Sequence, residues 1–178
     1  MTFIGFSRPK EQLTSALVSV GDIAPPSSAL CATERLRVVA FIRHVGCPFA
    51  ENTVKQLREW AERHPHVAIF VVSHGDAAAV AEWIGAIGGL GSLRLVVDTR
   101  RELHGQWGVG YSSLGHVVGL PSLLGAFTLL FKGIHNRSAS GTRWQRSATF
   151  MADGDRIVWS HLPRYAQEFA LPPEHLVR

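Results

Sequence analysis

One cysteine occupies the position in the chain that is best suited to chemistry. Residues 41–50 read FIRHVGCPFA, so Cys47 lies between Gly46 and Pro48 directly after an apolar run. Pro48 suits the first turn of a helix, where its missing N–H breaks no hydrogen bond. Thiols at helix N-termini lose their proton more readily, because the helix dipole and the unpaired N–H groups stabilise the thiolate. The pattern therefore predicts a reactive thiol at Cys47.

Two basic side chains precede this cysteine. Arg43 and His44 are expected at the carboxyl end of a strand, where reactive groups gather in open α/β sheets. An inert buried cysteine is the alternative, since free cysteine is among the most buried residue types. The histidines show no metal-ligand spacing with either cysteine, and the nucleophile elbow of serine hydrolases does not occur. We therefore expect thiol chemistry without a metal or cofactor.

Hydrophobic periodicity predicts the elements that hold these residues. We expect strands at 35–44, 67–75, 93–98, 147–153 and 156–161, and helices at 48–63, 77–87 and 163–169. A further short helix is expected to start at a cap formed by Asp98 or Thr99 and to run through Trp107. Asp153-Gly154-Asp155 indicates a hairpin turn between the last two strands. The strand and helix order predicts an α/β fold with a mixed central sheet and helices on both faces, as in thioredoxin-like proteins.

A doubly wound nucleotide-binding fold is the competing architecture. It requires a glycine-rich phosphate turn between the first strand and helix. The glycine-rich stretch here, 85–92, follows a helix and precedes a strand, which is the wrong context for that fingerprint.

Composition narrows the class of protein further. The chain has 178 residues, 46% of them hydrophobic and 18% charged, which suits a single globular domain. The net charge is +4 without a Lys/Arg run, so a nucleic-acid partner is not expected. A loose basic group, Arg137, Arg143 and Arg146, forms either a solvated surface or an attraction for an anionic substrate. Two cysteines and the lack of a signal-peptide pattern predict a cytoplasmic protein.

An apolar stretch at 114–131 has the length of a membrane span. It contains His116, Pro121 and Ser122 in the middle of an otherwise soluble pattern, so we do not expect it to cross a membrane. A core helix, or a homodimer contact through 114–131, is the preferred interpretation.

Four segments together resemble the peroxiredoxin superfamily: VGDIAPPSSAL, VVDTRRELHGQWGV, SATFMADGDRIVWSH and FIRHVGCPFAENTVKQL. The last is most similar to the AhpC/TSA-type peroxiredoxin-like branch related to selenoprotein L, with its R-h-x-G-C-x-x-C motif. The resemblance covers residues 20 to about 162. It implies a thioredoxin-like three-layer sandwich forming one domain over 1–178, with an N-terminal extension at 1–20 and an insert at about 111–145.

The resemblance assigns roles to individual residues. Cys47 matches the peroxidatic cysteine, and Arg43, His44 and Gly46 match the residues before it. Four positions depart from the family pattern: Ala40 replaces a proline, His44 a threonine, Ser147 the arginine that stabilises the transition state, and Ala50 the branch's second cysteine. Arg146 stands one position from that lost arginine.

These residues support two main hypotheses. The first is an enzyme, a one-Cys oxidoreductase in which Cys47 reduces hydroperoxides and His44 or Arg43 stabilises the leaving oxygen. Gly46, Pro48 and Arg146 would contact substrate, and an external thiol or Cys31 would restore Cys47. The alternative is a thioredoxin-fold binding or interaction module whose catalysis has decayed. A third interpretation, taken from the branch, is reduction of a larger endoperoxide-type substrate.

Overall fold

A five-stranded sheet organises the computed structural model, which describes residues 14–112, 128–129, 133–134 and 137–177. The strand order is β3-β2-β1-β4-β5. The strands are β1 (Leu36–Phe41), β2 (Val67–Ser73), β3 (Arg94–Val97), β4 (Ala148–Asp153) and β5 (Arg156–His161). The helices are α1 (Pro48–Arg63), α2 (Ala77–Ala86) and α3 (Glu102–Gln106), with 3-10 turns η1 (Ser28–Leu30) and η2 (Glu174–Leu176).

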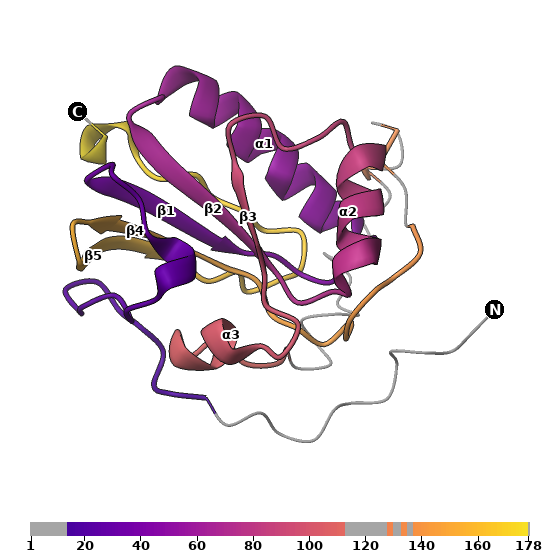
Figure 1. Cartoon of the computed structure of the whole chain (residues 1–178), viewed down its shortest axis with the longest axis horizontal. Helices are drawn as coiled ribbons and strands as arrows, with labels where there is room; N and C mark the ends of the chain where they lie inside the picture. Colours follow the sequence, from indigo (N-terminus) through magenta and orange to yellow (C-terminus); the bar gives the residue numbers. More distant parts are fainter. Residues whose placement is uncertain (1–13, 113–127, 130–132, 135–136, 178) are drawn as a thin grey trace.

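The sheet is mixed and lies between two layers. Strands β1, β2 and β3 run parallel, whereas β4 pairs antiparallel with β1 and β5 antiparallel with β4. Helices α1 and α2 cover one face, and α3 lies against the other (Figure 1). Each face carries its own cluster of buried apolar side chains. The predicted mixed α/β sandwich is therefore confirmed.

Most predicted elements are found within a few residues of their expected bounds. Helix α1 begins at Pro48 and ends at Arg63 as predicted, and Asp76 caps α2 through the N–H groups of Ala78 and Ala79. The hairpin turn is also found, with Gly154 at a φ of 59°. Residues 163–169 were predicted as a helix, and this is wrong. Glu168 instead accepts a hydrogen bond from the N–H of Arg164, and the segment forms a short turn.

The apolar stretch 114–131 lies almost wholly outside the described residues, so its predicted roles as a core helix or a dimer contact stay predictions. Among the helices that the structure describes, none has both the length and the apolar character needed to cross a membrane.

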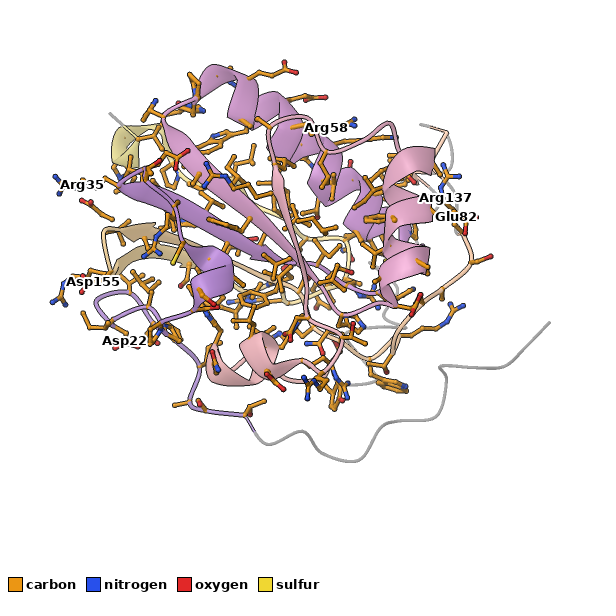
Figure 2. All side chains as sticks on the ribbon, viewed as in Figure 1. Asp22, Arg35, Arg58, Glu82, Arg137 and Asp155 are labelled. Carbon is orange, nitrogen blue, oxygen red and sulfur yellow. The ribbon has the colours of Figure 1, made fainter. Side chains whose placement is uncertain are left out.

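The two ends of the sheet differ in their side chains. Arg35, Asp22 and Asp155 lie at one side of the molecule, by the amino end of β1, while Arg137 lies at the opposite side, beside α2 (Figure 2). Because β1, β2 and β3 are parallel, their carboxyl ends meet at one edge of the molecule. The residues that follow these three strands are Ile42 to Cys47, His74 and Asp98, and they form the candidate site.

Candidate active site

The turn between β1 and α1 places Cys47 at the start of the helix. Gly46 has a φ of 83°, a left-handed conformation that glycine adopts without strain. Cys47 follows as the N-cap residue in extended backbone, and its carbonyl accepts a hydrogen bond from the N–H of Glu51 at 3.1 Å. Cys47 is only 2% exposed. The predicted position of the thiol at a helix N-terminus is therefore confirmed.

The sulfur of Cys47 contacts a guanidinium. Nη1 of Arg43 lies 3.7 Å from Sγ of Cys47. Arginine keeps its positive charge at any pH that proteins tolerate, so the sulfur lies beside a permanent cation. The sulfur accepts no hydrogen bond from the first turn of α1, although the sequence predicted that helix N–H groups would point at it. The local positive charge thus comes from Arg43 together with the helix dipole.

Residues 137–143, here called the strap, cover the turn that carries Cys47. The N–H of Arg137 donates to the carbonyl of Gly46 at 2.9 Å, and Ser140 forms a bridge with Val45. A Cβ atom on Gly46 would lie 2.4 Å from the carbonyl oxygen of Ser138, so the strap needs glycine there. At the other end of the strap, the carbonyl of Arg143 accepts a hydrogen bond from Nη2 of Arg43 at 3.2 Å.

A buried carboxylate anchors the strap to α1. Glu51 is 1% exposed and accepts hydrogen bonds from Nε of Arg137 at 3.3 Å and Nζ of Lys55 at 2.7 Å. From the sequence, Arg137 belonged to a loose basic group that could be either a solvated surface or an attraction for an anionic substrate. The structure shows that Arg137 and Arg143 of that group hold the strap against the Cys47 turn.

His44 is buried beside Arg43 without a hydrogen-bond partner for either ring nitrogen among the described residues. Burial, followed by the charges of Arg43 and Arg143, lowers the pKa of His44 well below its usual value. The imidazole is therefore neutral at pH 7. His44 was predicted as one of two cationic donors, and the structure leaves Arg43 alone in that capacity.

Three further polar residues meet at the same edge and were not singled out from the sequence. His74 follows β2, and its Nε2 lies 3.1 Å from the carbonyl oxygen of Thr142 in the strap. Asp98 follows β3 and accepts from Nδ1 of His104 at 2.7 Å. The rings of His74 and His104 meet edge to face, 5.6 Å apart. The sequence signal for His74 and Asp98 was their position at strand ends, which alone does not separate them from solvated residues, and His104 lies within α3.

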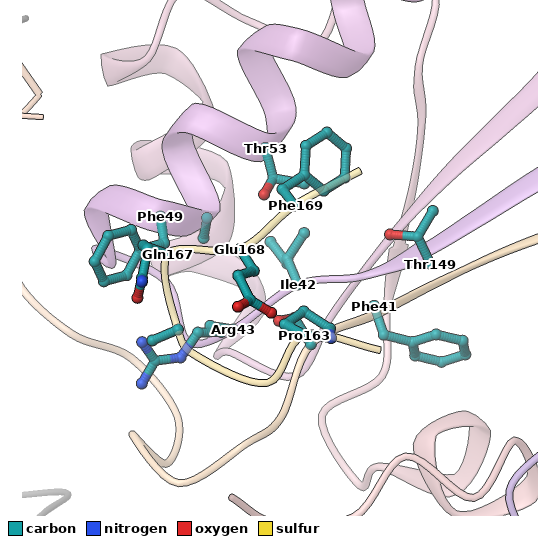
Figure 3. A pocket seen from close by; sticks show the side chains of 13 residues that line it. Phe41, Ile42, Arg43, Phe49, Thr53, Thr149, Pro163, Gln167, Glu168 and Phe169 are labelled. Atoms are coloured by element: carbon teal, nitrogen blue, oxygen red, sulfur yellow. The ribbon is translucent and has the colours of Figure 1, made fainter. Parts of the chain in front are cut away.

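Arg43 also lines a pocket. Its lining comes from the end of β1, the first turns of α1, the start of β4 and the turn at 163–169 (Figure 3). Arg43, Phe49, Thr149 and Gln167 contribute to this lining, together with Ala50, where the predicted branch resemblance would place a second cysteine. Cys47 does not line the pocket.

Arg146 does not join the cysteine in the described contacts. Its Nη2 donates to the carbonyl of Pro163 at 3.3 Å. Ser147, at the position of the family's arginine, lines the pocket beside Arg43. The guanidinium at the thiol therefore comes from the turn after β1 rather than from the residues just before β4.

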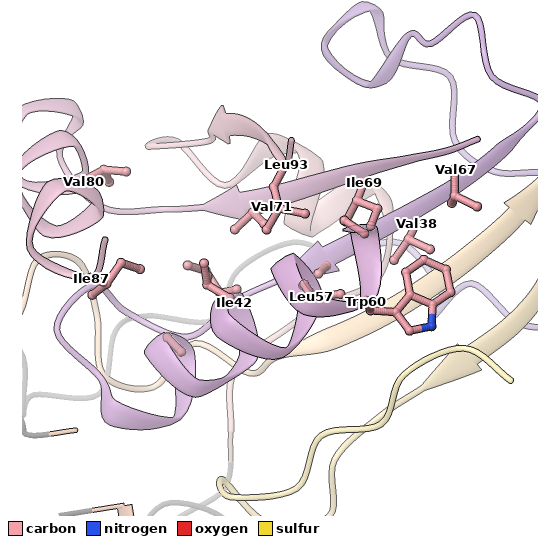
Figure 4. Close-up of a cluster of buried hydrophobic side chains, with 14 of the residues drawn as sticks. Val38, Ile42, Leu57, Trp60, Val67, Ile69, Val71, Val80, Ile87 and Leu93 are labelled. Carbon is pink, nitrogen blue, oxygen red and sulfur yellow. The ribbon is translucent and has the colours of Figure 1, made fainter. Parts of the chain in front are cut away.

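The core keeps α1 in register with the sheet. Leu57 and Trp60 of α1 pack with Val38 of β1 and Ile69 of β2 in one buried cluster (Figure 4). Cys47 belongs to the same cluster. Because interiors are close-packed, this contact fixes the start of the helix and the cysteine with it.

The second cysteine lies at the opposite end of β1. Cys31 follows η1, is exposed, and approaches the carbonyl of Ser27 at 3.6 Å. Within the described residues, no cluster of three potential ligands for a metal ion is found.

The sheet order and the helix that starts after a buried cysteine define the class of protein, a thioredoxin-like fold of the peroxiredoxin type. Among solved structures, the chain is similar to a peroxiredoxin-like protein from Aquifex aeolicus, with a TM-score of 0.62 and 15% identity over 89% of this chain and 84% of that one. It is also similar to a thiol peroxidase from Chromobacterium violaceum, with a TM-score of 0.61 and 14% identity over 92% and 87% of the two chains. A third similar structure is peroxiredoxin 5 from Alvinella pompejana, with a TM-score of 0.54 and 13% identity over 83% of this chain and 90% of that one. These likenesses show the fold.

A family model described as AhpC/TSA antioxidant enzyme matches residues 52–164, which is more than half of the chain. The chain therefore belongs to the AhpC/TSA antioxidant enzyme family. Among curated proteins, no significant match is found. The match begins after Cys47, so the role of this cysteine rests on the geometry of the site. The closer link to the selenoprotein L branch stays a prediction.

Proposed function

We propose that the protein is a one-Cys thiol peroxidase that reduces hydroperoxides through Cys47. The observation that carries this proposal is the contact between Nη1 of Arg43 and Sγ of Cys47 at the N-terminus of α1. Both the guanidinium and the helix dipole stabilise a thiolate, which is the nucleophilic form of cysteine. Membership of an antioxidant enzyme family supports the same chemistry.

In the first step, the Cys47 thiolate attacks the terminal oxygen of the hydroperoxide. The S–O bond forms while the O–O bond breaks, which gives a sulfenic acid on Cys47 and an alkoxide that takes a proton from water. Arg43 supports this step, because its guanidinium lies beside the sulfur, where it can stabilise the negative charge that develops on the leaving oxygen.

The sulfenic acid then needs a reductant from outside the site. Ala50 replaces the neighbouring cysteine of the branch, and Cys31 lies at the other end of β1. Sulfenic acids can also condense with a backbone N–H, but the next residue is Pro48, which has none. A small thiol would form a mixed disulfide with Cys47 and release water, and a second would release Cys47 as thiol.

The proposal is tested by following hydroperoxide consumption with a panel of small thiols, comparing wild type with Cys47→Ser. We expect thiol-dependent turnover that Cys47→Ser abolishes, together with a sulfenic acid on Cys47 that a dimedone probe captures. A Cys47 thiol that survives millimolar hydroperoxide unchanged would disprove the proposal.

A binding or interaction module is the second candidate function. It is favoured by the burial of Cys47, which is 2% exposed, because peroxide must displace covering side chains to reach the sulfur. The rate at which a small alkylating reagent modifies Cys47 in the folded protein separates the two. A rate near that of a fully buried, inert cysteine supports the module, and a fast rate at neutral pH supports the enzyme.

A further inference from the structure

His74 occupies the carboxyl end of β2 and has no part in the steps above. It is 4% exposed, and its Nε2 lies 3.1 Å from the carbonyl oxygen of Thr142. Burial and the neighbouring His104 lower the pKa of His74 to about 3, so the ring is neutral in the functional range of pH. A neutral ring with a carbonyl at Nε2 carries its proton there, so Nε2–H donates to Thr142.

His74 donates its hydrogen bond to Thr142 of the strap, and the next residue, Arg143, orients Arg43. The carbonyl of Arg143, one residue after Thr142, accepts from Nη2 of Arg43 at 3.2 Å, while Nη1 of the same guanidinium reaches the sulfur of Cys47 at 3.7 Å. A Cβ on Gly141 would lie 2.7 Å from Cδ2 and Nε2 of His74, so the strap backbone rests directly on the imidazole.

A second buried histidine supports the ring of His74. His104 is fully buried and meets His74 edge to face at 5.6 Å. Asp98 accepts from both Nδ1 and the backbone N–H of His104, at 2.7 and 3.0 Å. Burial alone would raise the pKa of Asp98, but the hydrogen bonds from His104 hold it below its usual value, so the carboxylate stays ionised. The orientation of His104 is thereby fixed.

We propose that His74 is a positioning residue that holds the strap so that the Arg43 guanidinium stays on the Cys47 sulfur. Three consecutive strand ends then cooperate: Asp98 after β3 orients His104, His74 after β2 fixes the strap, and Arg43 after β1 contacts the thiol. The reaction assigned to the site rests on the proposed function, whereas the effect of His74 on the thiol does not depend on it.

The test compares His74→Phe, which keeps a ring without a donor, with His74→Gln, whose amide keeps an N–H at similar reach. The alkylation rate of Cys47 is measured at pH 7 and at about pH 9.5, where free thiols are largely ionised. We expect His74→Phe to lower the rate at pH 7 by roughly three- to tenfold, the loss of one hydrogen bond, with little change at the higher pH. His74→Gln should recover most of the rate.

His66→Phe is the matched control, because Nε2 of His66 also lies against a backbone carbonyl, that of Val177, at 2.8 Å and away from the strap. It should leave both rates unchanged. Equal losses at the two pH values in His74→Phe would indicate a structural effect and overturn the proposal. So would wild-type rates in His74→Phe, or failure of His74→Gln to recover.

Hydroperoxide consumption, measured in parallel, separates this inference from the proposed function. If wild type consumes no hydroperoxide while His74→Phe still loses alkylation only at pH 7, the proposed function fails and the positioning role stands. If turnover depends on Cys47 but the alkylation rates of His74→Phe match wild type, the positioning role fails and the proposed function stands.

Discussion

Polar side chains at the two ends of β1 differ in their exposure and in their hydrogen-bond partners. At the amino end, Arg35 pairs with Asp153 in solvent, and Arg37 donates to the backbone carbonyls of Leu30 and Gly154. At the carboxyl end, Arg43 and His44 are buried, and Nε of Arg43 and both ring nitrogens of His44 lack partners among the described residues.

This difference separates a stabilising end from a reactive one. Exposed ion pairs contribute little and are easily replaced. Buried polar atoms without partners cost free energy, and proteins keep them mainly where chemistry needs them. The carboxyl end of β1 is therefore the end to perturb, and the amino end supplies the matched controls.

The largest expected effect on activity comes from Arg43→Met. The substitution keeps the length of the side chain but removes the charge from the sulfur of Cys47. Loss of one donor to a developing oxyanion lowers rates by about 10²–10³-fold, and we expect a fall of this size in hydroperoxide reduction. Arg35→Met at the amino end should change the rate less than twofold. If Arg43→Met and Arg35→Met lowered the rate of hydroperoxide reduction equally, the distinction between a reactive end and a stabilising end of β1 would be wrong.

A glycine substitution at the carboxyl end of β1 should lower the free energy of unfolding more than one at the amino end. Gly46 has a φ of 83°, and a Cβ there would meet the carbonyl oxygens of Ser138 and Arg137 at 2.4 and 2.8 Å. Gly154 has a φ of 59° with nothing within 4 Å of its Cβ position. We expect Gly46→Ala to lower the free energy of unfolding by about 3 kcal/mol, from left-handed strain plus overlap.

For Gly154→Ala only the strain remains, about 1 kcal/mol. Urea denaturation of both variants gives the comparison. Equal losses would mean that the strap does not press on the Cys47 turn in solution.

The start of the site could be predicted from the sequence because its signals are local. Gly46, Cys47 and Pro48 mark a turn, an N-cap and a helix start, and the structure has α1 begin there. The strap could not be predicted, because its contacts join residues far apart in the sequence, such as Arg137 with Gly46 and Thr142 with His74. The hydrophobic periodicity of a sequence does not indicate contacts between such distant residues.

Burial explains the error about His44. A histidine beside an arginine at a strand end suggests a cationic pair when only the sequence is read. In the structure, burial removes that charge, and the neighbouring guanidiniums of Arg43 and Arg143 add to the effect. The failed helix at 163–169 has a different cause, because the Glu168 carboxylate accepts a hydrogen bond from the backbone N–H of Arg164 in its own segment.

Acid should destabilise the carboxyl end before the amino end. Burial keeps His44, His74 and His104 neutral in the folded protein by lowering their pKa values, while an unfolded histidine titrates near 6.5. Below about pH 6.5 the unfolded chain therefore binds more protons, and the free energy of unfolding falls as the pH falls. At the amino end, the hydrogen bond from Arg35 lowers the pKa of Asp153, so this carboxylate needs a more acidic solution.

His74 makes this prediction quantitative. Its pKa of about 3 leaves it uncharged from pH 6.5 down to near that value, while the unfolded histidine gains its proton, so the slope it contributes rises toward about 1.4 kcal/mol per pH unit as the pH falls below 6. Urea denaturation between pH 7 and pH 5 should show that His74→Gln reduces the slope by about 1 kcal/mol per pH unit, averaged over this range. The exposed Arg35→Met variant should keep the wild-type slope in that range. Identical slopes in wild type and His74→Gln would contradict the burial of a neutral ring.

The smallest effect is expected from Cys31→Ser. Cys31 precedes β1 and Cys47 follows it, so the length of the strand, roughly 17 Å at about 3.3 Å per residue, separates the two. A disulfide requires Cα atoms within about 7 Å, so the two cysteines cannot pair while the sheet is folded. Hydroperoxide turnover with a small thiol should match wild type. A Cys31–Cys47 disulfide in monomeric protein after one equivalent of peroxide would show that the sheet opens during the cycle, and the two ends of β1 would then act together.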